Sequence, residues 1–147
     1  MRLAIAATLA ALTTASAAEP AITAIEAKLF YERSGTLSDN VAEPAGVTLW
    51  NTVIGEGGAG EPANDVLVVV TVKADPISYQ EAPLAIRITG ADGKTVATRK
   101  VQGLLIGSEG TVSKGVYLQD MTCNALTIKA TIGKSTKETK VPFACGE

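Results

Sequence analysis

The side chains that could do chemistry in this chain are few. The 147 residues include no histidine and only two cysteines, Cys123 and Cys145. Without histidine, the chain cannot build a Ser-His-Asp or Cys-His nucleophile, or a zinc or iron site with histidine ligands. The cysteines lack Cys-x-x-Cys spacing, which argues against a redox pair or a metal site. Paired carboxylates, as in glycoside hydrolysis, are the catalytic chemistry that remains. We therefore favour a non-catalytic protein over an enzyme.

Carboxylates gather in two loops of irregular sequence, residues 36–46 and 55–65. No lysine or arginine occurs between Ser34 and Val72. Loops at the end of a β-sandwich can converge, and clustered oxygen ligands suit calcium. The candidate calcium ligands are Asp39, Glu43, Glu56, Glu61 and Asp65. The competing interpretation is a solvated acidic rim. We favour it, because the sequence has no EF-hand spacing and no dense Asp-x-Asp pattern.

The second loop also contains a literal dinucleotide-binding pattern. Gly55-Glu56-Gly57-Gly58-Ala59-Gly60 matches G-x-G-x-x-G. That motif requires a following helix, whose N-terminus holds the pyrophosphate. Here a valine-rich strand follows instead, and the neighbouring acidic residues would repel a phosphate. We interpret the segment as a flexible glycine connection and predict no cofactor, with calcium at the acidic loops as the alternative.

A tryptophan and a set of lysines are the other candidate binding residues. Trp50 is the only tryptophan, and we expect it to plug the core rather than to stack on a ligand. The lysines occupy the C-terminal segment, at Lys129, Lys134, Lys137 and Lys140. Lysines on an exposed edge strand usually prevent other strands from pairing with it, and we favour that role over an anion-binding face.

Short extended segments must position these residues. Alternating apolar and polar residues predict strands over 22–32, 47–54, 84–89, 95–101, 111–118, 125–132 and 137–143, and residues 102–110 form a short strand or a covering loop. Residues 66–72 are almost continuously apolar, which predicts a central strand covered on both faces. Asp92-Gly93 predicts a hairpin turn. Seven or eight strands without a helical period predict an all-β antiparallel sandwich.

The two cysteines bracket the last predicted hairpin. If its turn centres on Lys134, Cys123 and Cys145 lie directly opposite each other, at a separation that a disulfide tolerates. Closing this loop would stabilise the fold by roughly 3 kcal/mol in the chain-entropy model. Pro142 cannot donate to a β-ladder, so the returning strand is predicted at a sheet edge. The alternative is two free, buried cysteines.

In outline the pattern resembles immunoglobulin-like or fibronectin-like exported modules. The resemblance covers residues 19–147 and is architectural. It departs from antibody domains, because the order Cys…Trp…Cys is missing and the cysteines bracket one hairpin instead of joining two sheets. No functional residue follows from it, since one fold serves many functions.

The N-terminus predicts export. Residues 1–18 combine one positive charge, an apolar run and small residues before a cleavage point at Ala18 or Glu19, which is typical of a secretory signal peptide. The alternative is an N-terminal helix of the fold. Cleavage leaves a single domain, residues 19–147, in the periplasm or outside the cell. The whole chain carries a net charge of −2, which offers little to nucleic acid, and no other apolar stretch is long enough to span a membrane.

These features predict an exported, non-catalytic protein with a binding or structural role in the cell envelope. Its partner would be a protein or a glycan, contacted through the loops 36–46 and 55–65, because recognition concentrates in long loops on a rigid scaffold. The alternative is a calcium-dependent or carbohydrate-directed domain, hydrolytic or not, that uses the acidic residues of the same loops.

Overall fold

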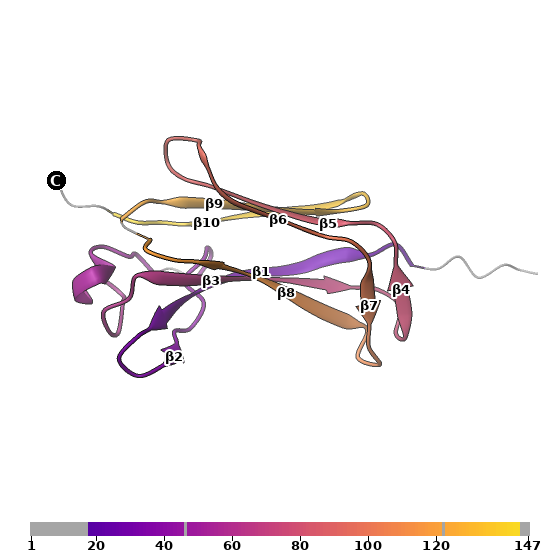
Figure 1. Ribbon diagram of the computed structural model, residues 1–147, viewed down its shortest axis with the longest axis horizontal. Helices are drawn as coiled ribbons and strands as arrows, with labels where there is room; N and C mark the ends of the chain where they lie inside the picture. The colour runs from indigo at the N-terminus through magenta and orange to yellow at the C-terminus, as the bar shows by residue number, and fades with distance from the viewer. Residues whose placement is uncertain (1–17, 46, 122, 145–147) are drawn as a thin grey trace, which may run out of the picture.

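The computed structural model describes residues 18–45, 47–121 and 123–144. Two four-stranded antiparallel sheets pack face to face (Figure 1). The first sheet has the order β2-β1-β3-β8, and the second has the order β10-β9-β5-β6. A small ribbon of β4 and β7 lies at one end. The strands are β1 (Ala21–Tyr31), β2 (Thr36–Leu37), β3 (Asp65–Lys73), β4 (Ser78–Gln80), β5 (Leu84–Thr89), β6 (Thr95–Val101), β7 (Leu104–Ile106), β8 (Thr111–Leu118), β9 (Leu126–Ile132) and β10 (Ser135–Val141).

The predicted all-β, immunoglobulin-like or fibronectin-like sandwich is confirmed. The described residues contain ten strands rather than seven or eight. The additional ones include β2 and β4, which have two and three residues and therefore no recognisable periodicity. No helix in the described ranges is long and apolar enough to cross a membrane. The predicted signal peptide lies outside the described residues, apart from Ala18.

The core lies between the two sheets and comes from alternate residues of each strand. In β3, Val66, Val68, Val70 and Val72 are at most 1% exposed. The opposite sheet contributes alternate residues of β5 and β9 in the same way. The predicted central position of β3 is confirmed, because it pairs with β1 on one side and β8 on the other. The predicted cover on both faces was wrong, since Leu67 and the other outward residues are only half-buried.

The C-terminal hairpin forms with a tighter turn than predicted. Ile132 pairs with Ser135, so only Gly133 and Lys134 form the turn, and the register differs by one residue from the predicted one. The ladder ends at the pair Leu126–Val141, before either cysteine. Cys123 is not a free cysteine, but Cys145 lies outside the described residues, so the Cys123–Cys145 disulfide stays a prediction. The edge position of β10 is confirmed.

The predicted strand over residues 47–54 was wrong. Only Leu49 pairs, in an isolated parallel bridge to Phe143. The chain then winds into a short 3-10 turn, η1 (Thr52–Ile54), which ends at Gly55 in the left-handed region at φ 80°. The Asn51 carbonyl accepts hydrogen bonds from the amides of Ile54 and Glu56, which closes this turn. Glycine tolerates a positive φ without a steric cost, so the chain can curl here although its polar alternation resembles a strand.

Candidate functional site

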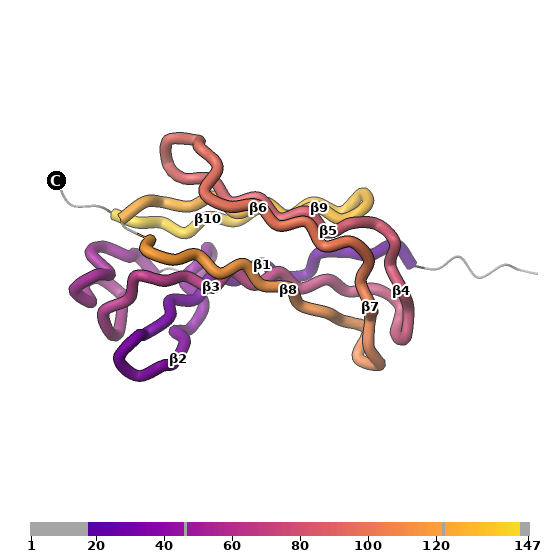
Figure 2. Tube along the Cα trace, in the orientation of Figure 1, coloured from indigo at the N-terminus to yellow at the C-terminus, as the bar shows by residue number. Residues whose placement is uncertain are grey.

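Three apolar side chains stand exposed around η1. Trp50 is 55% exposed, Val53 47% and Ile54 60%. Trp50 is therefore not the predicted plug of the core. We call these three residues the Trp50 surface. The turn that carries it projects from the end of the sandwich opposite the β4–β7 ribbon (Figure 2). Large apolar side chains that gather at a loop tip are typical of contact surfaces for other molecules.

The stem of this loop is held firmly by the body of the fold. Leu49, next to Trp50, is fully buried. Its amide donates to the Pro142 carbonyl at 3.3 Å, and its carbonyl accepts from the Ala144 amide at 2.7 Å. The Sγ atom of Cys123 lies 3.5 Å from the Trp50 carbonyl oxygen. The C-terminal segment therefore fixes the point from which the Trp50 side chain projects.

The distal half of the loop is also tied back. The Ala63 amide donates to the Thr52 carbonyl at 2.8 Å, and the Gly60 amide donates to the Tyr31 hydroxyl at 3.0 Å. The Trp50 ring packs on the backbone of Gly57, where an added Cβ would lie 2.6 Å from the ring carbon Cγ. Glycine is required at this position both by that contact and by its φ of 59°. The segment that matches G-x-G-x-x-G therefore makes room for the Trp50 ring at Gly57. It is followed by the strand β3 and not by the helix that dinucleotide binding requires.

The structure does not bring the five candidate calcium ligands together. Among the described residues, no group of three or more carboxylate, cysteine or histidine side chains could hold a metal ion. Asp39, Glu43 and Glu56 are exposed at separate points of their loops. Glu61 is partly buried near the loop end. Asp65 begins β3 and accepts hydrogen bonds from the Tyr117 hydroxyl and the Asp120 amide.

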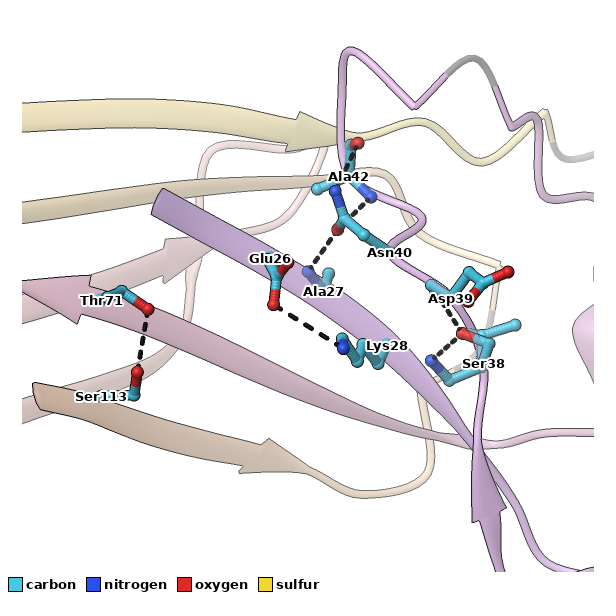
Figure 3. A network of polar contacts seen from close by, with 10 residues as sticks. Glu26, Ala27, Lys28, Ser38, Asp39, Asn40, Ala42, Thr71 and Ser113 are labelled. Atoms are coloured by element: carbon cyan, nitrogen blue, oxygen red, sulfur yellow. Dashed lines mark hydrogen bonds and ion pairs between the residues drawn. The ribbon is translucent and has the colours of Figure 1, made fainter. Parts of the chain in front are cut away.

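The loop of residues 36–46 uses its polar groups to cover the edge of β1 (Figure 3). The Asn40 side-chain oxygen accepts from the Ala27 amide at 2.9 Å and from the Ala42 amide at 3.1 Å. The Ser38 hydroxyl accepts from the Leu29 amide at 2.9 Å. β2 pairs only with the last two residues of β1, so the rest of this edge has no neighbouring strand among the described residues. The side chains of Ser38 and Asn40 bond to its free amides instead, which protects the edge from pairing with another chain. This loop therefore has a structural task within the fold.

The Tyr117–Asp65 hydrogen bond gives a testable titration. The Tyr117 hydroxyl lies 2.5 Å from Asp65 Oδ2, and this bond to a carboxylate raises the pKa of Tyr117 to about 12. Since the pKa is higher in the folded than in the unfolded chain, the contribution to stability is present below about pH 10 and is lost as the pH rises toward 12.

We expect an ultraviolet absorbance titration, with Tyr117→Phe as the reference, to place this ionisation near pH 12. Asp65→Asn should move it toward pH 10. An ionisation that stays unchanged in Asp65→Asn would contradict the assignment.

A second exposed apolar cluster was not foreseen from the sequence. On the β4–β7 ribbon, Ile77 is 83% exposed, Leu105 77% and Tyr79 60%. Tyr79 and Leu105 are directly opposite in the ladder, and Ile77 adopts an unusual positive φ of 52°. Ile77 is a single apolar residue between Pro76 and Ser78 and belongs to no periodic pattern, so only its positive φ and the exposure of the three side chains reveal the cluster. It lies at the far end from the Trp50 surface.

The four C-terminal lysines divide into two pairs. Lys134 forms an ion pair with Glu19 at 2.6 Å, which raises the pKa of Lys134. Lys137 donates to the Thr23 carbonyl at 2.9 Å. These two lysines help to close the edge of the sandwich between β10 and β1. Lys129 and Lys140 point to the outer face of the second sheet instead.

Comparisons with known proteins find distant similarities among solved structures. No protein-family model matches the chain, and no curated protein matches its sequence. Among solved structures, the chain is similar to a β-glucuronidase of Bifidobacterium dentium complexed with coumarin-3-O-glucuronide, at 14% identity and a TM-score of 0.44. The similarity covers 84% of this chain and 17% of that enzyme.

Proposed function

We propose that this chain is an exported, non-catalytic β-sandwich that binds a protein partner through the Trp50 surface. The observation that carries the proposal is the exposure of Trp50, Val53 and Ile54 on a loop whose stem is buried and hydrogen-bonded. Tryptophan is among the side chains that dominate binding energy at protein interfaces. A loop held in place loses little conformational entropy when it binds.

The chemistry of the surface favours a protein over a glycan. Trp50 alone would suit a sugar ring, but Val53 and Ile54 are aliphatic and offer no hydrogen bonds to hydroxyl groups. An apolar pocket or sheet face of a protein would bury all three side chains. The signal-peptide pattern of residues 1–18 supports export, and the absence of histidine supports a role without catalysis. The calcium-dependent alternative has less support, because the acidic side chains of the described loops do not group.

The test compares two ends of the same molecule. The immobilised protein would be exposed to an extract of the envelope and medium of its own source cells, and retained proteins would be quantified by mass spectrometry. We expect Trp50→Ala to reduce the specifically retained partner about tenfold or more, since a central tryptophan contributes on the order of 2 kcal/mol or more.

Tyr79→Ala is the matched control, because it also removes an exposed aromatic side chain, at the opposite end. It should retain the partner. Unchanged retention in Trp50→Ala, or a loss confined to Tyr79→Ala, would overturn the proposal and shift attention to the β4–β7 ribbon.

A further inference from the structure

The outer face of the second sheet carries a concentration of positive charge. In β5, Leu84, Ile86 and Ile88 point into the core, so Arg87 points outward. The register places Lys129 directly opposite Arg87, Lys100 opposite Ala85 and Lys140 opposite Thr127. These partners therefore share the outward face. We call Arg87, Lys100, Lys129 and Lys140 the basic face.

A shallow groove of about 380 Å³ runs along this face. Its polar lining includes four basic residues and no carboxylate. They are Arg87, Arg99, Lys100 and Lys129, with the hydroxyl groups of Thr98 and Thr131 between them. Arg99 differs from the other three, because it pairs with the inward residue Ile86 and donates to the Gly115 carbonyl of β8. It therefore ties the edge strand β6 to the first sheet and is not part of the basic face. The whole chain is mildly acidic, with a net charge of −2, so this groove is a local reversal of sign.

One carboxylate compensates part of this charge, because Glu138 lies directly opposite Lys129 in the ladder of β9 and β10 and shares the outward face. Within the described ranges, Lys100 and Lys129 form no ion pair, whereas Lys28, Lys94 and Lys134 each have a carboxylate partner. In the part of the chain that the structure describes, the Arg87 side chain bonds only to the hydroxyl of Thr95, at 2.9 Å. Like charges directly opposite each other on adjacent strands destabilise a sheet, and Arg87 and Lys129 are such a pair. Glu138 offsets part of this cost at Lys129. Arg87 has only Thr98 and Lys129 opposite it, so an anion seated beside Arg87 would lower the cost further.

We propose that the basic face binds an extended anionic polysaccharide. The four cations of the basic face come one from each strand of the second sheet. This distribution suits a linear polymer with repeated charges. Threonine hydroxyls between the cations can exchange hydrogen bonds with sugar hydroxyl groups. The lining of the groove contains no aromatic side chain, and binding of single-stranded nucleic acid usually relies on base stacking. This second site lies on a sheet face, apart from the loop of the Trp50 surface.

Dextran sulfate and uncharged dextran provide the direct test, because they share one backbone and differ in charge. We expect the wild-type protein to bind dextran sulfate at low ionic strength in isothermal titration calorimetry, with affinity that falls as salt rises. Uncharged dextran should give no binding. The triple variant Arg87→Gln, Lys100→Gln, Lys129→Gln should bind dextran sulfate at least about tenfold more weakly, since each exposed ion pair contributes up to about 1 kcal/mol.

A charge-matched variant separates the face from the net charge. The control triple variant is Arg33→Gln, Lys28→Gln, Lys73→Gln. It removes the same number of positive charges from β1, β3 and the turn after β1, and it should bind dextran sulfate like the wild type. Circular dichroism and the melting temperature would verify that both variants fold. Three results would overturn the proposal: no binding by the wild type, equal losses in the two variants, or tighter binding to DNA than to dextran sulfate. Trp50→Ala should keep this binding, so the two sites can fail independently.

Discussion

Replacing Leu49 by alanine should lower the free energy of unfolding by about 2–5 kcal/mol. Leu49 is fully buried and provides the one bridge between the loop of residues 47–62 and Phe143. Its truncation would leave a cavity where the loop meets the C-terminal segment. The neighbouring Trp50→Ala should cost about 1 kcal/mol or less, because a side chain that is more than half exposed loses little burial.

Urea denaturation of both variants, followed by circular dichroism, measures this difference directly. It also tests the assignment of roles, because Leu49 should serve stability and Trp50 should serve binding. Ile128→Ala offers a reference, since Ile128 is fully buried in the central strand β9. A Leu49→Ala variant with wild-type stability, or a Trp50→Ala variant as unstable as Ile128→Ala, would contradict the structure around η1.

Strand positions could be predicted wherever apolar alternation extends over several residues. The inward residues of β1, Ile25, Ala27 and Leu29, are buried as their spacing indicated. The hairpin at Asp92-Gly93 also forms, with a register irregularity between Ile88 and Thr89. In these segments local periodicity and sheet packing require the same orientation of the side chains, so the sequence pattern suffices.

Prediction failed where a single tertiary contact or a turn residue decided the outcome. Residues 47–54 alternate like a strand, but only Leu49 finds a partner and Gly55 lets the chain curl. The C-terminal turn uses two residues instead of a centre at Lys134, which shifts the register by one. A continuous apolar run in β3 suggested cover on both faces. Leu67 shows that neighbouring strands alone can half-bury such a residue without a further layer.

The candidate site was only partly visible in the sequence. Trp50 was recognised as a candidate, although its exposure could not be known. Val53 and Ile54 were assigned to a strand, and only the turn of η1 shows that their side chains are exposed. The basic face could not be predicted either, because Arg87 and Lys129 are distant in the chain and only the β5–β9 pairing places them opposite each other.

Removing both cysteines should weaken stability and partner binding together. The predicted Cys123–Cys145 disulfide would close a loop of a little over twenty residues, so Cys123→Ala, Cys145→Ala should lower the free energy of unfolding by roughly 3 kcal/mol. The neighbourhood of Cys123 explains the effect on binding. Its Sγ atom lies 3.5 Å from the Trp50 carbonyl oxygen, and the Ala144 amide holds the Leu49 carbonyl. A loosened C-terminal segment would therefore release the stem of the Trp50 loop.

The disulfide itself can be checked by mass spectrometry of the intact protein with and without reductant after thiol alkylation. We expect no alkylation until the protein is reduced. Denaturant titration and the pull-down would then be repeated on the double variant, and both should show a loss, whereas binding to dextran sulfate should persist because the basic face lies on the outer sheet surface. Full alkylation without reductant would exclude the bridge. A destabilised variant that still binds its partner would instead show that the loop keeps its shape without the anchored tail.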